Sequence, residues 1–359
     1  MIEDCLKLSA YLAERRRTDT GFVSDVVLAL YQQHGLASSA VLRGIAGFGA
    51  GHHFRTDESL TLSEDPPVAI VAVDTSSKIE AVFDQVVAVR RRSLVTVERS
   101  RLLREEIGPL ELPEELNEAV KLTIYVGRRE RVYGVPAYIA ICDLMYRRQI
   151  AGASVFLGVD GIAHGQRQRA HLLGRNANVP MMIIAVGSGE RIGRVLPELG
   201  GLIRRPLMTL ERVRVCKRDG ELLGRPHGLP EADEHGLPLW QKLMIYTSES
   251  AHYNGEPIHR ALIQRLWRDR TSDGATVLRG IWGFHGDHQP HGDRVFALSR
   301  RVPVVTVIID TPAKIAESFA VVDELTRNEG LVTCEMVPAL VMGAPDNGAG
   351  RPPMAHYRY

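Results

Sequence analysis

The stretch AVLRGIAGFG at residues 40–49 is repeated, in changed form, twice further along the chain. It returns as SVFLGVDGIA at residues 154–163 and as TVLRGIWGFH at residues 276–285. Three further segments recur around it in a fixed order. They are KLSAYL, KLTIYV and KLMIYT near the start of each copy, PVAIVAVDT, PMMIIAVGS and PVVTVIIDT after it, and LVTVE, LMTLE and LVTCE at the end. Self-similarity at this spacing predicts three tandem domains.

The repeats set the expected domain boundaries. We place the copies at residues 5–104, 120–216 and 240–341. Residues 105–119 and 217–239 are the expected linkers, and the second, rich in Gly, Pro and charge, is predicted to be exposed. Residues 342–359 hold little that could be buried and are predicted to form a flexible tail.

Composition narrows the class of protein. The 359 residues carry a formal net charge of +1, which gives no overall field favouring nucleic acid or an anionic membrane. The four cysteines form no CxxC pair, so the sequence indicates neither a disulfide framework nor a zinc site. The N-terminus has no basic start followed by an apolar stretch, and no apolar run approaches the roughly 20 residues that span a bilayer. We therefore expect a cytoplasmic protein with neither a nucleic-acid partner nor membrane insertion.

Within each copy the pattern predicts β-α-β-β-α-β, the order of a ferredoxin-like unit. Thr75, Ser188 and Thr311 are expected to cap the second helix of their copies. The third strands, such as VAIVAV at residues 68–73, are apolar on both faces, and two helices can cover only one of them. We predict an α+β fold in which three ferredoxin-like repeats pack as a pseudo-trimer within one chain, and hence a monomer in solution.

These motifs resemble a known family. KLSxYLxER, VLRGIxGFG, SEDxPVxIxxVDT, KI and LVTxE are similar to the PII-like family called domain of unknown function 190, within the PII signalling superfamily. The resemblance covers nearly the whole chain, once per copy. It implies effector binding, for example of a nucleotide, in clefts between repeats, and a long loop that contacts a protein target such as a membrane transporter. The Gly-rich C-terminal phosphate segment of true PII proteins is absent, so ATP binding is not implied.

The repeated glycine motif gives the first candidate ligand site. Its glycines can present backbone N–H groups to an anion, its arginine can pair with a phosphate or carboxylate, and its phenylalanine can stack on a base. The alternative is a bulge or tight turn in which the glycines serve only geometry. The candidates are Arg43, Gly44, Gly47, Phe48 and Gly49 in the first copy and Arg279, Gly280, Gly283 and Phe284 in the third.

Charged residues at two further positions are also candidates. The start of the second helix carries an aspartate and a lysine in two copies: Asp74 with Lys78, and Asp310 with Lys314. These residues either bind a ligand or have a structural role, in which the aspartate complements the helix dipole. Glu14 and Glu249 follow the first strand and either bind a ligand hydroxyl or lie on the surface.

The middle copy differs from the other two at these positions. It has Arg128 in place of the glutamate, Leu157 in place of the arginine, Ile162 in place of the phenylalanine and Gly187 in place of the aspartate. The middle copy is therefore expected either to complete the ring of three repeats without binding a ligand or to bind a different ligand.

Two other classes of function remain open. His285, His288 and His291 form HxxHxxH, which suits a divalent metal and a CutA-like metal-binding function, although a loop with this spacing fixes no geometry. An enzyme using the clefts is a further alternative, but the sequence has no Gly-x-Ser-x-Gly elbow and no Walker A loop. We predict a non-enzymatic regulator that requires no cofactor. A small anionic effector would order the loops at residues 49–65 and 286–301, and these would act on a protein partner.

Overall fold

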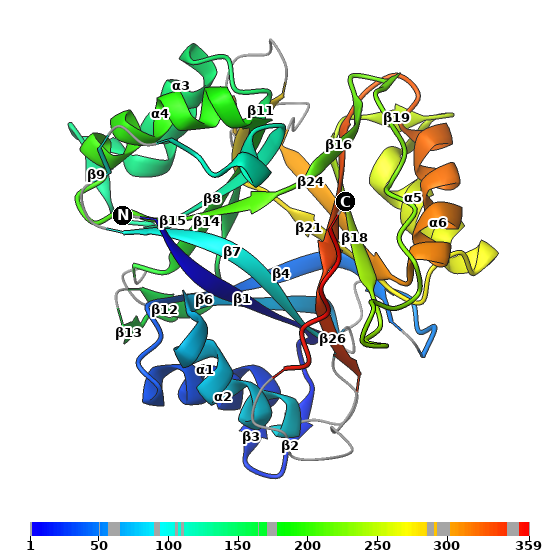
Figure 1. Cartoon of the computed structure of the whole chain (residues 1–359), viewed down its shortest axis with the longest axis horizontal. Helices are drawn as coiled ribbons and strands as arrows, with labels where there is room; N and C mark the ends of the chain where they lie inside the picture. Colours follow the sequence, from blue (N-terminus) through cyan, green and yellow to red (C-terminus); the bar gives the residue numbers. More distant parts are fainter. Residues whose placement is uncertain are drawn as a thin grey trace.

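The computed structural model describes residues 2–49, 51–56, 65–89, 94–104, 107–108, 111–163, 165–170, 178–285, 291–292, 302–342 and 352–358. The fold is mixed α and β, with a large, curled antiparallel sheet and, among the described residues, six helices. The helix pairs α1/α2, α3/α4 and α5/α6 lie on the outside, and the strands lie between them (Figure 1). None of the described helices has the length and apolar character needed to cross a membrane.

Each repeat contributes two helices and the strands of one β-α-β-β-α-β unit. The first has β1 (Ile2–Ala13), α1 (Val23–Gln33), β4 (Ser38–Phe48), β6 (Pro67–Thr75), α2 (Ser76–Val89) and β7 (Leu94–Arg104). The second has β8 (Ala119–Gly127), α3 (Ala137–Arg147), β11 (Gly152–Leu157), β12 (Asp160–Ala163), β14 (Pro180–Ser188), α4 (Gly189–Leu202) and β15 (Leu207–Arg212). The third has β18 (Trp240–Ser248), α5 (Ile258–Asp269), β21 (Ala275–Arg279), β22 (Trp282–His285), β24 (Pro303–Asp310), α6 (Pro312–Leu325) and β25 (Leu331–Val337).

Each repeat also contains shorter elements. A two-stranded hairpin precedes the first helix of each repeat: β2 (Arg17–Thr18) with β3 (Gly21–Phe22), β9 (Arg131–Val132) with β10 (Val135–Pro136), and β19 (His252–Tyr253) with β20 (Glu256–Pro257). The remaining short elements are β5 (Arg55–Thr56), the 3-10 helix η1 (Glu114–Leu116), β13 (Gln166–Arg167), β16 (Arg214–Arg218), β17 (Glu221–Leu222), β23 (His291–Gly292) and β26 (Ala339–Met342).

The second helices begin where the sequence predicts. The Ser188 hydroxyl accepts a hydrogen bond from the backbone N–H of Arg191, and the Thr311 hydroxyl accepts one from that of Lys314. These side chains satisfy donors that have no partner within the helix, which fixes the start of α4 and α6. Thr75 likewise directly precedes α2, and its hydroxyl lies 3.3 Å from that of Ser77.

Strand order is the same in the three repeats. The last strand pairs with the first, the first with the third, and the third with the second, all antiparallel: β7-β1-β6-β4, β15-β8-β14-β11 and β25-β18-β24-β21. The third strands are buried on both faces, as predicted. Ile70 packs with the helices of its own repeat, whereas Val71, Ile184 and Val307 meet in one central cluster drawn from all three repeats.

The second strands join the repeats in a cycle. The second half of β4 pairs with β21 of the third repeat, β12 pairs with the first half of β4, and β22 pairs with β11 of the second repeat. Each repeat thus donates the end of its second strand to a neighbour. The glycine motif that identified the repeats lies in these donated ends.

Described residues of the second linker and of the tail pack against the rest of the chain. Lys217, Asp233 and Leu239 of the linker are buried, and β16 pairs with β25. In the tail, Ala355 is fully buried and donates its N–H to the carbonyl of Pro338. The linker and tail pack on one another because Leu229, Leu239 and Ala355 form a small apolar cluster of their own.

Candidate functional site

The glycines of the repeated motif allow neighbouring repeats to approach closely. A Cβ on Gly283 would lie 2.3 Å from the carbonyl oxygen of Ala153, and one on Gly47 would lie 2.8 Å from that of Ala275. Gly44 and Gly280 are equally confined, by the carbonyls of Val277 and Val155. Only glycine fits where two backbones come this near. The contacts of these four glycines therefore fit the alternative in which the glycines serve backbone geometry. Gly49 differs, because the space around its Cβ position is open.

The phenylalanines of the motif enter the core of the adjacent repeat. Phe48 is 6% exposed and packs in the cluster of the third repeat, which includes Leu262 and Leu266 of α5. Phe284 is 5% exposed and meets the ring of Tyr146 of α3 edge-on, with ring centroids 5.5 Å apart. Apolar contacts already bury the ring of Phe48. Stacking of Phe48 on a ligand base stays a prediction, and it would require the ring to leave this cluster.

The predicted arginines and glutamates pair with each other. Arg279 donates two hydrogen bonds to Glu249, Nε to Oε1 at 2.9 Å and Nη2 to Oε2 at 2.8 Å. Arg43 forms the matching ion pair with Glu14 at 2.9 Å, with the arginine side chain 56% exposed. The middle repeat has Leu157 and Arg128 at these positions, so the pair is missing there as a unit.

The predicted aspartates hold the chain together at the start of the second helix. Asp74 is fully buried and accepts hydrogen bonds from the N–H groups of Ala37 at 2.8 Å and Thr75 at 2.7 Å. Lys78 reaches it at 3.2 Å and Arg104 at 3.1 Å.

Asp310 repeats this arrangement in the third repeat. It accepts from the N–H groups of Asp273 at 2.7 Å and Thr311 at 2.9 Å. Lys314 pairs with Asp273 beside it. Both aspartates thus join the segment before the second strand to the start of the second helix.

The predicted metal ligands fall outside the described part of the chain. His288 lies outside the described residues, as do the side chains of His285 and His291. The loops predicted to relay a signal fall largely outside them as well, at residues 57–64, 286–290 and 293–301.

A large cleft opens between the second and third repeats. Its volume is about 1240 Å³, and it is walled by the end of α3, by β11 and β14, by the donated strand β22, and by the end of β18. Gly283 and Phe284 are the predicted site residues that line it. Pockets that bind small molecules occur preferentially at such junctions between domains.

Basic side chains outnumber acidic ones in the lining of this cleft, three to two. Arg147, Arg191 and Arg218 line it, together with the acidic Asp219 and Glu329. Arg191 donates to the carbonyl of Gln149 at 2.6 Å and Arg147 to that of Asp143 at 3.2 Å. Within the described part of the chain no carboxylate forms an ion pair with any of the three guanidinium groups, and the buried Nε of Arg218 has no hydrogen-bond partner. The cleft is therefore suited to an anion.

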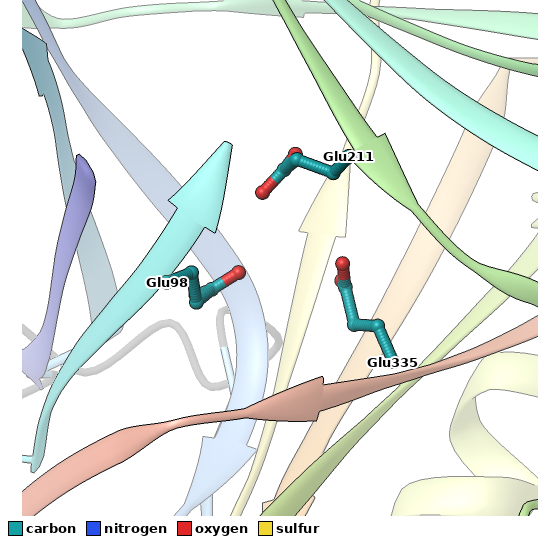
Figure 2. A group of neighbouring side chains, drawn as sticks. All are labelled: Glu98, Glu211 and Glu335. Atoms are coloured by element: carbon teal, nitrogen blue, oxygen red, sulfur yellow. The ribbon is translucent and has the colours of Figure 1, made fainter. Parts of the chain in front are cut away.

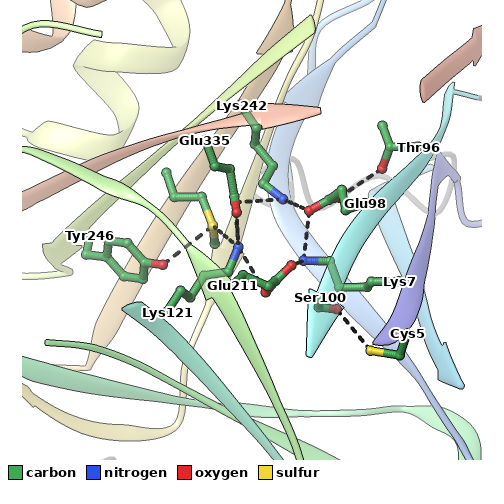
Figure 3. A network of polar contacts seen from close by, with 11 residues as sticks. Cys5, Lys7, Thr96, Glu98, Ser100, Lys121, Glu211, Lys242, Tyr246 and Glu335 are labelled. Atoms are coloured by element: carbon green, nitrogen blue, oxygen red, sulfur yellow. Dashed lines mark hydrogen bonds and ion pairs between the residues drawn. The ribbon is translucent and has the colours of Figure 1, made fainter. Parts of the chain in front are cut away.

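Six buried charges form a closed ring where the three repeats meet. Each lysine of the opening motif lies between two glutamates of the closing motif, one from its own repeat and one from a neighbour (Figure 3). The members are Lys7, Lys121, Lys242, Glu98, Glu211 and Glu335, each at most 6% exposed. Lys7 contacts Glu98 at 2.8 Å and also Glu211, Lys121 contacts Glu211 at 3.2 Å and Glu335 at 2.5 Å, and Lys242 contacts Glu335 at 2.8 Å and also Glu98.

Charge compensation within the ring is complete. The three carboxylates point toward one another, with oxygens within 4.8 Å, from the last strands of three repeats (Figure 2). Three ammonium groups lie between them, so each negative charge has positive neighbours. The ring therefore has the chemistry of an internal salt-bridge network, in which a carboxylate cluster needs no added cation.

The pKa values of the ring reflect burial opposed by close charges. Burial disfavours the charged form of Lys7 and Lys242, but the adjacent carboxylates prevail and raise the pKa of both. Burial likewise opposes ionisation of Glu98 and Glu335, but the neighbouring lysines lower the pKa of both. At Lys121 burial prevails and its pKa is lowered.

Sequence reasoning missed this ring, although a signal for it was present. The lysine of KLxxY and the glutamate closing LxTxE are kept in all three copies, including the middle copy, which loses the counterparts of Glu14, Arg43 and Asp74. A charge retained while the surrounding pocket changes points to a role in the scaffold.

Comparison with known proteins agrees with the repeat structure. The chain matches the family DUF190, described as "Uncharacterized ACR", over residues 5–102, 119–215 and 240–339. A curated relative, a UPF0166 protein of Aquifex aeolicus (strain VF5), is 32% identical over 100 residues, which make up 28% of this chain and 92% of the relative. That relative is therefore about as long as one repeat. With three matches over most of its length, the chain belongs to the DUF190 family.

Proposed function

We propose that this protein is a PII-like regulator that binds one small anionic effector in the cleft between its second and third repeats. The observation that carries the proposal is the cleft itself, with Arg147, Arg191 and Arg218 on its walls and no carboxylate of the described residues paired with them. Guanidinium groups form strong, directional hydrogen bonds to phosphate and carboxylate. A nucleotide is one candidate effector, on the strength of the resemblance to PII proteins.

The scaffold in this proposal is a pseudo-trimer of ferredoxin-like repeats. Its support is the common strand order, the cyclic exchange of second strands and the central apolar cluster that all three repeats share. A single-repeat relative is consistent with an ancestor that assembled from separate chains.

The clefts in this proposal are not equivalent. Arg43 and Arg279, the arginines first suggested by the sequence, already have Glu14 and Glu249 as partners, and a ligand would have to displace them. Arg147 and Arg191 belong to the middle repeat, for which the sequence left two alternatives: no binding, or binding of something different. We assign the effector to this repeat and its third-repeat neighbour.

Relay to a protein partner is the second half of the proposal. The donated strand β22 lines the cleft at Gly283 and Phe284, and residues 286–301 follow it directly in the sequence. Effector contact with β22 would change the exposure of this segment and hence binding of a target. Hydrogen exchange of peptides covering residues 286–301, with and without effector, tests this step. Unchanged exchange on saturation would rule out the relay.

The binding test is a thermal-shift panel of adenine nucleotides, cyclic nucleotides, bicarbonate and divalent metals, with calorimetry of any hit. A ligand present at about 100 times its dissociation constant stabilises the native state by roughly 2.7 kcal/mol. We expect Arg147→Leu and Arg191→Leu to weaken binding of the hit. Arg194→Leu is the matched control, because Arg194 lies on the same helix α4 and pairs with Glu190 in solvent.

The outcomes separate the alternatives. Binding lost in Arg43→Leu or Arg279→Leu but kept in Arg147→Leu and Arg191→Leu would move the site to the positions predicted from sequence. A metal hit lost on substitution of His285 or His288 would favour the CutA-like alternative. Turnover of a panel compound would make the protein an enzyme.

A further inference from the structure

The middle repeat lacks a carboxylate that the other two repeats hold at the start of their second helix. Asp74, Gly187 and Asp310 occupy the same place in register, each opposite the residue just before the ring lysine: Leu6, Val120 and Gln241. Only the middle repeat has glycine here, so the position carries no side chain and no charge.

The groups that bind this carboxylate in the sister repeats have counterparts in the middle one. In the first repeat they are the N–H of Ala37, the ammonium of Lys78 and the guanidinium of Arg104. Ala151 and Arg191 stand where Ala37 and Lys78 do, directly before the second strand and in the first turn of the second helix. The third donor, Arg104, is replaced by Lys217, which pairs with Asp323 instead. Two of the three donors have thus been kept, and the acceptor has been removed.

Two cavities meet at this position. Ala151 and Arg191 line the large cleft, while Gly187 and Ser188 line a smaller neighbouring cavity of about 400 Å³. Arg218 lines both, which places the two side by side.

The smaller cavity is also basic. Its second arginine, Arg214, donates to the ring of His227 at 3.1 Å, and it has no ion-pair partner among the described carboxylates. Its equivalent in the first repeat, Arg101, pairs with Asp4 and with Glu115. The one acidic side chain of this cavity, Glu118, is exposed.

We propose that the middle repeat binds a carboxylate or phosphate group beside Gly187, in the place that an aspartate carboxylate fills in the other two repeats. Arg191 and the N–H of Ala151 hold the anion from the side of the cleft, and Arg218 approaches it from the linker strand β16. The start of α4, whose N–H groups favour negative charge, adds to the attraction. This inference rests on the proposed cleft and names the chemistry of its anchoring group.

The test restores the missing carboxylate. Gly187→Asp supplies the chain's own anion at the proposed site, and Gly187→Ala is the matched control that adds a Cβ without charge. A Cβ at this position would lie 3.3 Å from the end of Ile192, so a small shift of a flexible side chain accommodates it. Aspartate is fully buried in the same place at Asp74, so both variants are expected to fold, as circular dichroism would verify.

Inorganic phosphate is the probe, measured by calorimetry on the full chain. We expect one saturable site in the wild type, affinity close to wild type in Gly187→Ala, and a loss of about tenfold or more in Gly187→Asp, the effect of one charge-assisted hydrogen bond. If free phosphate does not bind but a hit from the effector panel does, and Gly187→Asp weakens that hit, the anion is a group of a larger effector and the inference stands.

Two results would overturn it. Binding that Arg147→Leu weakens and Gly187→Asp leaves unchanged removes this site but keeps the cleft. Failure of phosphate and of every panel compound to bind the wild type removes both.

Discussion

At the scale of single residues, the ring of six buried charges is a feature whose disruption is expected to cost stability. Each carboxylate is buried between two ammonium groups, and loss of one partner leaves the others without compensation in a medium of low dielectric constant. Removal of the whole network is a different experiment from removal of one member, because only the latter leaves an unpaired charge.

Glu98→Gln tests this directly. The change keeps the shape of the side chain but leaves Lys7 and Lys242 with one carboxylate each, and we expect the free energy of unfolding to fall by about 3–5 kcal/mol. Glu190→Gln is the control, since Glu190 forms an exposed pair with Arg194 and its loss should change stability by less than about 1 kcal/mol. Equal stability of the two variants in urea unfolding would contradict the energetic role of the ring.

The same residues set a pH dependence. The pKa values of Glu98 and Glu335 are lowered on folding from 4.5, so their stabilisation is present above that pH and is lost as the pH falls further. The pKa values of Lys7 and Lys242 are raised from 10.5, so the stabilisation from these two lysines is present below that pH and is lost as the pH rises above it. The pKa of Lys121 is lowered, so its contribution to the pH dependence has the opposite sign.

We therefore expect the loss of stability at acidic pH to be easier to measure than the loss at alkaline pH. The unfolding free energy of the wild type should fall as the pH drops below 4.5, and that of Glu98→Gln should fall less steeply. Parallel pH profiles of the two proteins would show that Glu98 does not contribute to the loss of stability at acidic pH.

At the scale of elements, the donated ends of the second strands hold neighbouring repeats together. The close approach depends on glycine, so a single methyl group should disturb an interface without touching a repeat's own core. Gly283→Ala places a Cβ 2.3 Å from the carbonyl of Ala153, and we expect a loss of about 1–3 kcal/mol.

Gly201→Ala is the matched control for that substitution. No atom lies within 4 Å of its Cβ position, and it lies in the last turn of α4, where alanine favours the helix. We expect its melting temperature to stay the same or rise. A melting temperature of Gly283→Ala as high as that of the control would show that the donated strand has room to shift.

The sequence predicted the positions of helices and strands better than it predicted which strands and side chains pair with one another. Hydrophobic patterning located the strands, and the caps at Ser188 and Thr311 marked two helix starts, because these signals are local. The pairing of β22 with β11, like the pairing of Arg279 with Glu249, depends on residues 30 to more than 100 positions apart. Motif reading assigned Gly283 and Arg279 to a ligand because nothing local shows that another part of the chain occupies the same space.

At the scale of the whole molecule, the cycle of strand exchange is closed within one chain. Among the described residues, the second strand of each repeat pairs with one neighbouring repeat through its end and receives the strand end of the other. We expect sedimentation to give the mass of one chain, 39.7 kDa. A mass three times larger would show that repeats pair between chains instead.

The joining of three repeats into one chain also changes what a mutation can do. In an assembly of identical chains, one altered codon appears in every cleft, and a change that improves one site must be tolerated at all of them. Here, Gly187 stands in the middle repeat alone, and Asp74 and Asp310 stay in place in the other two repeats. Three repeats in one chain can each carry a different side chain at such a position, whereas the lysines and glutamates of the charge ring are contributed by all three repeats to one network.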